Sequence, residues 1–426
     1  MRFGWVVLAV GVTCGGACEG AGEGASTSTA TTTATTTTAS TETSTATSTE
    51  TSTTTTKPAP TPKPAPTAKP ALAPPGACAL QSTTPVHSPA GPGRVAHSPE
   101  AFWVAAYIPT TPERVQLWRA TPGSRPQPQL TLPLPVPHPS ERTVPPAITT
   151  LSNDRLALAA VDDLGTLHTA VFPRSATRAT WRALAKGADR RFTPALAEVA
   201  GEATVAWTFA RDKAMGVKVA RLTGKPEPID VTPESHGAAA PRFIRGNDAP
   251  ALVMIDARAG LSPLLEVPFN PAGAPLPARV GTPVNSPFAP SELAAVRVPD
   301  GEVDVAYTAI GNLAASAVGH VPLRRSAQPT ALVPSKGYGA LHVDVDVGSR
   351  RAVYAADATQ TTKPDAPHEV RVRLHDGEGT SEPLVLAGAD GHASNAAVAV
   401  DPATGTTAVL YRSAGDLFLA WLACDV

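Results

Sequence analysis

Short, continuously apolar runs recur in pairs through most of the chain, and a polar or glycine-containing turn separates the two runs of each pair. The first runs are residues 102–108, 156–161, 204–209, 251–255, 303–308, 352–356 and 407–411, and the second runs are 115–120, 167–172, 217–222, 264–269, 315–321, 370–374 and 417–422. An apolar run of about four to eight residues between turn signals is typical of a strand that is buried on both faces. The pattern predicts seven antiparallel hairpins.

Further strands are expected on both sides of each hairpin. Residues 193–197, 240–244 and 395–400 are candidate inner strands, and residues 129–134, 228–231 and 383–387 are candidate outer strands bounded by proline. Proline suits an edge strand, because the missing N–H is not needed by a further neighbour. Residues 176–185, which could form a helical turn, are interpreted as the outer strand of the second unit.

The units recur at a nearly constant interval. Taking Tyr107, Val161, Trp207, Ile255, Tyr307, Ala356 and Tyr411 as equivalent gives intervals between 46 and 55 residues. A repeat of about 50 residues that contains several strands is the signature of a β-propeller blade. We therefore predict an all-β, seven-bladed β-propeller, with six or eight blades, or two stacked sandwiches, as alternatives.

Composition narrows the class of protein. The chain has 46 Pro and 33 Gly among 426 residues, which excludes a helical bundle because proline interrupts helices. The formal net charge of −1 gives no basic surplus for a nucleic-acid partner. The sequence has no metal-ligand spacing, phosphate-binding loop or Gly-x-Ser-x-Gly motif, so we expect no metal and no cofactor.

The N-terminus is typical of an export signal. Arg2 precedes a ten-residue apolar run at 3–12, too short for a bilayer, which needs about 20 residues. The small residues before Cys18 resemble a bacterial lipoprotein signal, which implies cleavage after residue 17 and lipidation of Cys18. Lipidation of Cys14 and ordinary secretion are the alternatives.

Residues 18–75 are expected to be a disordered tether. Residues 26–56 contain Thr, Ser, Ala and Glu alone, and residues 57–75 are rich in Lys, Pro and Ala. Neither segment can bury enough apolar surface to offset the entropy lost on ordering. The folded domain is predicted to span residues 76–426.

The two ends of that domain are predicted to meet. The seventh unit lacks an outer strand, and the segment around Cys78 lacks a hairpin of its own. An N-terminal strand that completes the last blade would place Cys78 opposite Cys424, and a disulfide between them is reasonable in an exported protein.

Polar side chains in the loops that enter the inner strands, and in the turns between the two middle strands, should share one face of a propeller. We therefore predict a ligand-contacting set at one mouth of the channel, and no catalytic residue. The predicted set is Arg190, Arg191, His236, Tyr338, His392, Asp162 and Asp256, and Asp163 and Asp357 lie in corresponding turns.

At the level of architecture, the chain resembles bacterial lipid-anchored surface β-propeller proteins. The resemblance implies a monomeric, non-catalytic module in the cell envelope, on the outer membrane or the cell surface, attached only through its lipid, that binds an envelope protein or glycan. The alternative is a propeller enzyme, a glycan hydrolase or lyase, which would need paired carboxylates about 5–10 Å apart.

Overall fold

A computed structural model describes the chain from Cys78 onward, and all described residues belong to one compact unit. The described ranges are 78–135, 144–211, 214–234, 237–246, 250–256, 262–284, 289–298, 301–310, 317–323, 330–333, 338–339, 342–360, 368–376, 379–387 and 393–426. The predicted signal, Cys18 and the tether lie outside them. Within these ranges the regular elements are all strands, and no helix could serve as a membrane span.

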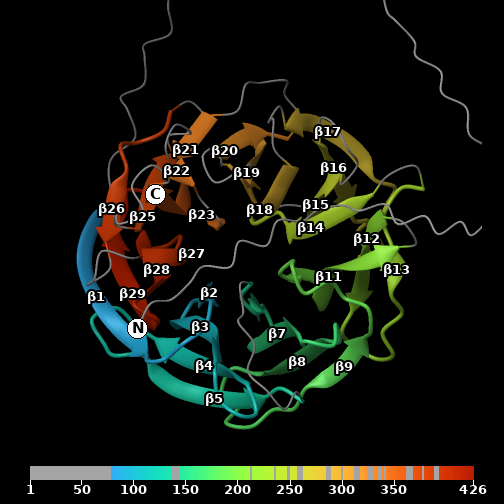
Figure 1. Cartoon of the computed structure of the whole chain (residues 1–426), viewed down its shortest axis with the longest axis horizontal. Helices are drawn as coiled ribbons and strands as arrows, with labels where there is room; N and C mark the ends of the chain where they lie inside the picture. Colours follow the sequence, from blue (N-terminus) through green and yellow to red (C-terminus); the bar gives the residue numbers. More distant parts are fainter. Residues whose placement is uncertain are drawn as a thin grey trace, which may run out of the picture. The chain divides into compact units, whose positions relative to one another are not determined.

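Small antiparallel sheets, four-stranded except for a five-stranded one in blade 6, follow one another around a ring (Figure 1). From the inner strand outward, blade 1 is β2 (Gly93–Ser98), β3 (Ala101–Ile108), β4 (Arg114–Ala120) and β5 (Gln127–Pro133); blade 2 is β6 (Ala147–Leu151), β7 (Arg155–Val161), β8 (Leu167–Pro173) and β9 (Arg182–Ala185); blade 3 is β10 (Ala195–Val199), β11 (Glu202–Arg211), β12 (Ala214–Arg221) and β13 (Ile229–Asp230).

The remaining blades continue the order. Blade 4 is β14 (Ala238–Phe243), β15 (Ala251–Asp256), β16 (Ser262–Pro268) and β17 (Arg279–Val284); blade 5 is β18 (Ala289–Arg297), β19 (Val303–Ile310), β20 (Ala317–Pro322) and β21 (Thr330–Val333); blade 6 is β22 (Tyr338–Gly339) and β23 (Val343–Val347) beside β24 (Ala352–Gln360), then β25 (Glu369–His375) and β26 (Leu384–Ala387); blade 7 is β27 (Ala393–Val400), β28 (Thr406–Ser413), β29 (Asp416–Ala423) and β1 (Ala79–His87). The fold is a seven-bladed β-propeller.

The predicted hairpins correspond to the two middle strands of each blade, so the seven-blade prediction is confirmed. One outer strand is shorter than expected, because only Arg182–Ala185 of residues 176–185 forms β9. Ala176, Ala179 and Trp181 instead pack as irregular chain against the core between blades 1 and 2.

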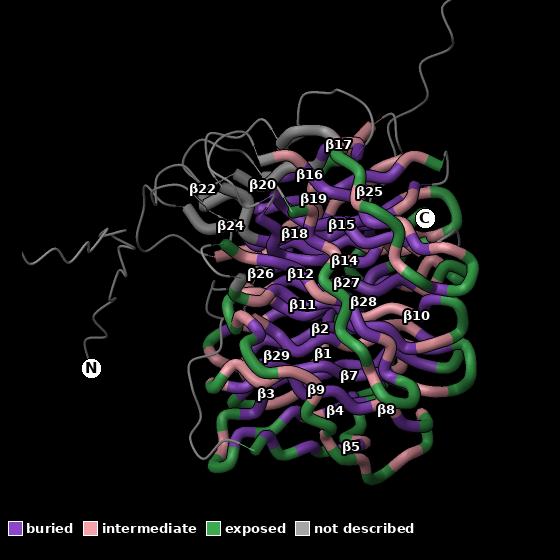
Figure 2. The backbone as a smooth tube through the Cα atoms, turned by 90° about the vertical axis from the view of Figure 1, so that its right-hand side faces the viewer, coloured by how far each residue is buried: buried purple, intermediate pink, exposed green. Residues whose placement is uncertain are grey.

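The hydrophobic core is divided among the interfaces between blades. Seven buried clusters occur among the described residues, each joining one blade to the next. The middle strands are therefore buried on both faces, as the continuous apolar runs predicted, while the turns at both ends are exposed (Figure 2).

The two ends of the folded domain meet in blade 7. β1 pairs antiparallel with β29, from Ala79 opposite Ala423 to His87 opposite Leu417. The predicted Cys78–Cys424 disulfide is present, with 4.2 Å between the Cα atoms. Gly405 has φ +72°, and a Cβ there would lie 2.6 Å from the Cys424 carbonyl oxygen, so glycine is required beside the bridge.

Candidate functional site

The inner strands enclose a cavity of about 520 Å³ in the central channel. Its walls come mainly from β2, β6, β10, β14 and β23, and it reaches the turns that follow the inner strands. Gly246 and Pro402, at that end of its lining, are exposed to solvent. The cavity is therefore accessible from the side on which each inner strand turns into its second strand.

A shared carboxylate holds two arginines from other blades in this channel. Glu292 on β18 accepts hydrogen bonds at Oε1 from Arg94 Nη2 on β2 (2.6 Å) and from Arg242 Nη2 on β14 (3.1 Å). Arg242 also donates from Nη1 to the Thr193 carbonyl oxygen of blade 3 (2.8 Å). One acidic side chain thereby connects blades 1, 4 and 5.

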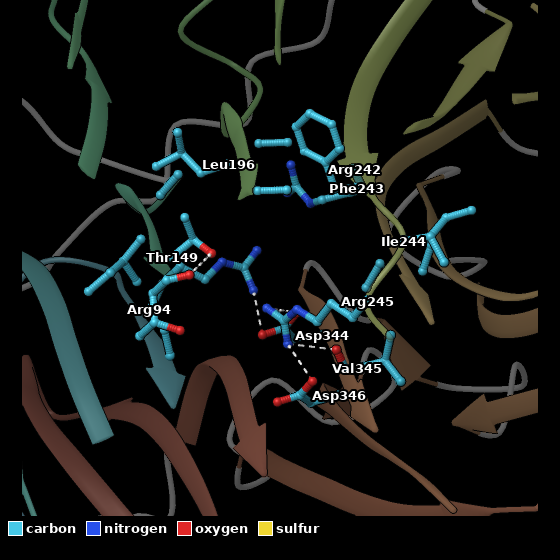
Figure 3. Close-up of a pocket in the computed structure, with 18 of the residues that line it drawn as sticks. Arg94, Thr149, Leu196, Arg242, Phe243, Ile244, Arg245, Asp344, Val345 and Asp346 are labelled. Atoms are coloured by element: carbon cyan, nitrogen blue, oxygen red, sulfur yellow. Dashed lines mark hydrogen bonds and ion pairs between the residues drawn. The ribbon is translucent and has the colours of Figure 1, made fainter. Parts of the chain in front are cut away.

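Two aspartates on β23 hold the third arginine (Figure 3). Arg245, just after β14, lies 3.4 Å from Asp344 Oδ1 and 3.9 Å from Asp346 Oδ1, measured from Nη2 and Nη1. The same aspartates accept hydrogen bonds from the backbone of blade 7, Asp344 from Val398 N (3.1 Å) and Asp346 from Val400 N (2.9 Å).

Asp344 also joins the two groups of contacts, since its Oδ2 lies 3.2 Å from Arg94 Nη1. We call Arg94, Arg242, Arg245, Glu292, Asp344 and Asp346 the channel network. Its three guanidinium groups and three carboxylates balance in charge when all are ionised.

The pKa values follow from burial and from these neighbours. Burial and the nearby charge of Arg94 lower the pKa of Arg242 to about 10, so this arginine is still charged at pH 7. Burial acts to raise the pKa of Asp344, but the charges of Arg245 and Arg94 outweigh it and lower the value. Burial raises the pKa of Asp346 despite Arg245, which makes this aspartate the more easily protonated of the two.

Several polar side chains outside the channel network lie nearer the open side of the cavity. Glu198 on β10 accepts hydrogen bonds from Ser152 N and Oγ of blade 2, both at 2.5 Å. Thr150 donates to the His97 carbonyl oxygen at 2.7 Å. Burial lowers the pKa of His97 below 6.5 although Asp401 is nearby, so the imidazole is neutral at pH 7.

The predicted ligand-contacting residues lie elsewhere. Asp162 follows β7 and Arg190 and Arg191 precede β10, at the opposite ends of the strands from the open side of the cavity. Arg190 lies 3.9 Å from Asp163, and Arg191 pairs with Asp189 at 2.6 Å. Tyr338 is in β22, whose backbone pairs with β24, while His236 and His392 lie outside the described residues. None of the described members lines the cavity, and their role as ligand contacts stays a prediction.

Asp162, Asp256 and Asp357, three acidic residues of the predicted turns, are buried. Asp162 accepts hydrogen bonds from Leu164 N and Thr166 N of its own turn and is hydrogen-bonded with His168 Nε2 at 2.8 Å. Asp256 is fully buried at the end of β15. Asp357 accepts hydrogen bonds from His342 N (2.9 Å) and, across the blade interface, from Asn395 N (3.3 Å).

The channel network was missed at the sequence level, although a signal for it exists. Residues 343–347 read Val-Asp-Val-Asp-Val, an alternation that places acidic side chains on one face of an inner strand. Its arginine partners, Arg245 and Arg94, stand about 100 and 250 residues away, without a motif around them. Among the described residues, no three His, Cys, Asp or Glu side chains gather as a metal site would require.

Comparisons with known proteins support the architecture. No protein-family model and no curated protein matches the sequence. The BP39L lectin from Burkholderia pseudomallei is similar in structure, with a TM-score of 0.54 and 17% identity over 78% of this chain and 96% of the lectin. The propeller domain of Myceliophteria thermophila Cps50 (Swd1) gives 0.50 and 12% over 82% and 99%, and the polysaccharide lyase Uly1 gives 0.50 and 9% over 79% and 91%. At these identities the likeness shows the fold alone.

Proposed function

We infer that this protein is an exported, lipid-anchored propeller that binds a partner in the cell envelope without transforming it. The observation that carries the proposal is the state of the acids in the cavity lining. Asp344 and Asp346 are held by arginine and by backbone amides, and Glu198 is held by Ser152. Acid–base catalysis needs groups that gain and lose protons during turnover, and holding these carboxylates in place favours binding instead.

Structural neighbours of this fold include a lectin and a polysaccharide lyase, so the fold is compatible with either binding or glycan cleavage. The second candidate function is the cleavage of a glycan, by hydrolysis or by elimination. A panel of envelope glycans incubated with the full-length protein should release no product. Product release that is lost in Glu198→Gln would contradict the binding proposal.

Binding itself is testable by capture from envelope extracts with the full-length protein. We expect one or more envelope components to be retained by the wild type and lost when Leu196 in the cavity wall is replaced by tryptophan. Leu164→Trp, on an exposed turn at the other end of the strands, is the matched control. Retention by both variants would place the binding surface outside the cavity.

The location of the protein rests on the N-terminal sequence. Metabolic labelling with a fatty acid should mark the wild type and the Cys14→Ala variant but not Cys18→Ala. Limited proteolysis at Lys57, Lys63 or Lys69 should release a folded fragment of about 350 residues, as expected for a flexible tether before a compact domain. Protection of all three lysines would contradict the tether.

A further inference from the structure

We propose that the channel cavity binds a neutral, hydroxyl-rich ligand, a saccharide without acidic groups, that enters from the side where the inner strands turn into the second strands. This inference rests on the proposed binding function and names its ligand class and its face. The face is opposite to the one on which the predicted contact residues lie.

The charges of the channel are already matched by one another. The three arginines and three carboxylates of the channel network are paired at 2.6 to 3.9 Å. The side chains of Arg94, Arg242, Glu292 and Asp344 are at most 13% exposed, so an ionic ligand that reached them would have to separate a buried pair, which is strongly unfavourable. Arg245 is 36% exposed, but both of its aspartates already hold it. Glu198 adds one negative charge near the open side, which disfavours an anion further.

Hydrogen-bonding groups also line the channel. β2, β6 and β10 are each the last strand of their sheet on the channel side, so one backbone edge of each faces the channel with both donors and acceptors. The neutral imidazole of His97 can donate and accept, as can the hydroxyl of Thr149. A sugar hydroxyl also donates and accepts, so it can replace the water that these groups would otherwise bind.

Glu198 supplies the strongest acceptor. Its carboxylate has about four acceptor positions, and the described donors from Ser152 use two of them. The remaining positions suit two neighbouring hydroxyls of one ring. Ser152 fixes the orientation of the carboxylate, so little side-chain entropy is lost on binding.

The walls of the cavity also offer apolar surface. Ile148 and Leu196 line the cavity and are only partly buried, which leaves apolar surface for the C–H face of a sugar ring. The volume of about 520 Å³ lies within the range of small-ligand sites, roughly 300 to 1,000 Å³.

The test uses the full-length protein on an array that carries neutral and acidic glycans, followed by calorimetry with the best neutral glycan. We expect binding to neutral glycans. Glu198→Gln should weaken binding about 10-fold or more, because a hydrogen bond to a charged group is lost. Glu202→Gln, four residues away and outside the cavity lining, should leave the affinity unchanged. Leu196→Trp should abolish binding by filling the cavity.

Thermal unfolding of each variant separates loss of binding from loss of folding, and Glu198→Gln, at a partly exposed position, provides the readout if Leu196→Trp is unstable. Binding confined to acidic glycans, equal binding by Glu198→Gln and Glu202→Gln, or binding to no glycan would each overturn the proposal. If envelope capture persists while no glycan binds, the ligand class is wrong and the binding function stands. If envelope capture also fails, both the proposed ligand class and the proposed binding function are wrong.

Discussion

Asp162, one of the predicted ligand contacts, makes hydrogen bonds that stabilise its own turn. Its carboxylate closes the turn between β7 and β8 and contacts His168 at the start of β8. Sequence reasoning placed it correctly in that turn. The sequence does not determine whether the Asp162 side chain points to solvent or back into the turn, because the same turn residues are compatible with both orientations.

We expect Asp162→Ala to lower the free energy of unfolding by about 2–3 kcal/mol, because two backbone amides and the buried His168 lose the acceptor that the buried Asp162 carboxylate provides. Chemical denaturation monitored by tryptophan fluorescence measures the loss. Asp163→Ala is the control. Its ion pair with Arg190 is 3.9 Å long and the Arg190 side chain is 62% exposed, so losing that pair should cost less than about 1 kcal/mol. Equal losses in the two variants would contradict this role.

Asp162 also makes the stability of the protein depend on pH. Burial acts to raise the pKa of Asp162, but hydrogen bonds from His168, Thr166 and Leu164 outweigh it and lower the pKa below 3.8. Because the folded value is the lower one, the stability that Asp162 contributes is complete well above pH 3.8 and is lost as the pH falls through the folded value. The difference between wild type and Asp162→Ala should therefore be constant from pH 5 to 7 and shrink below about pH 4.

At the scale of the elements, the strands were predictable and their irregularities were not. The continuous apolar runs predicted the positions of the middle strands, because a strand that is buried on both faces needs apolar side chains at successive positions. The inner strands of blades 4 and 7 carry bulges, with φ of +51° at Ala240 and +58° at Asn395. Neither alanine nor asparagine is diagnostic of this conformation. In both blades the preceding blade supplies a side-chain acceptor for the bulge: Ala240 N donates to Thr208 Oγ1, and Asn395 N donates to Asp357 Oδ2.

Thr208→Val should lower the free energy of unfolding by about 1–3 kcal/mol, since it leaves the buried amide of Ala240 without its acceptor across the interface of blades 3 and 4. Thr131→Val is the control, because the Thr131 hydroxyl is bonded to Gln116 on the exposed side of blade 1 and should change stability by less than about 0.5 kcal/mol. Urea denaturation and exchange of the Ala240 amide proton measure both effects. Unchanged protection of that proton would contradict the contact.

At the scale of the whole molecule, the channel network joins residues that are far apart in the sequence, Arg94 and Glu292 being 198 positions apart. This separation explains why the ring was predictable and its centre was not. The number of blades follows from the sequence repeat. The channel network does not follow the repeat, because blades 1, 4, 5 and 6 contribute different charged residues to it.

Glu292→Gln should destabilise the protein by about 3 kcal/mol or more, because Arg94 and Arg242 lose the anion they share. Replacing Arg242 and Glu292 together by methionine and leucine should recover part of that loss, since the double variant leaves fewer unpaired charges. Glu100→Gln, at an exposed ion pair, is the surface control. A double variant that loses more free energy of unfolding than the two single variants lose together would contradict the pairing.

Breaking the Cys78–Cys424 bridge should lower the free energy of unfolding by up to about 5 kcal/mol, because the bond restricts a loop of nearly the whole domain in the unfolded chain. Cys78→Ala and Cys424→Ala should lose the same amount as the double variant, since each removes the same bond. Denaturation with and without reductant provides the comparison, and a wild type insensitive to reductant would contradict it.

That β1 is needed to close the ring stays a prediction. Deletion of residues 78–88 would leave the outer edge of β29 open, and an open strand edge promotes association with other chains. We expect the deletion variant to form oligomers in size-exclusion chromatography. A monomeric variant with unchanged stability would contradict the requirement.

The position of the disulfide also determines how the domain responds to tension. A pull along the preceding chain enters the folded unit at Cys78, the first residue before β1, and there the bond transfers it directly to Cys424 at the end of β29. β1 is therefore not peeled from β29 one residue at a time from this end, and the load spreads into a central pair of strands in blade 7. Tension applied at Cys78 is therefore carried by blade 7 as a unit for as long as that one covalent bond remains oxidised.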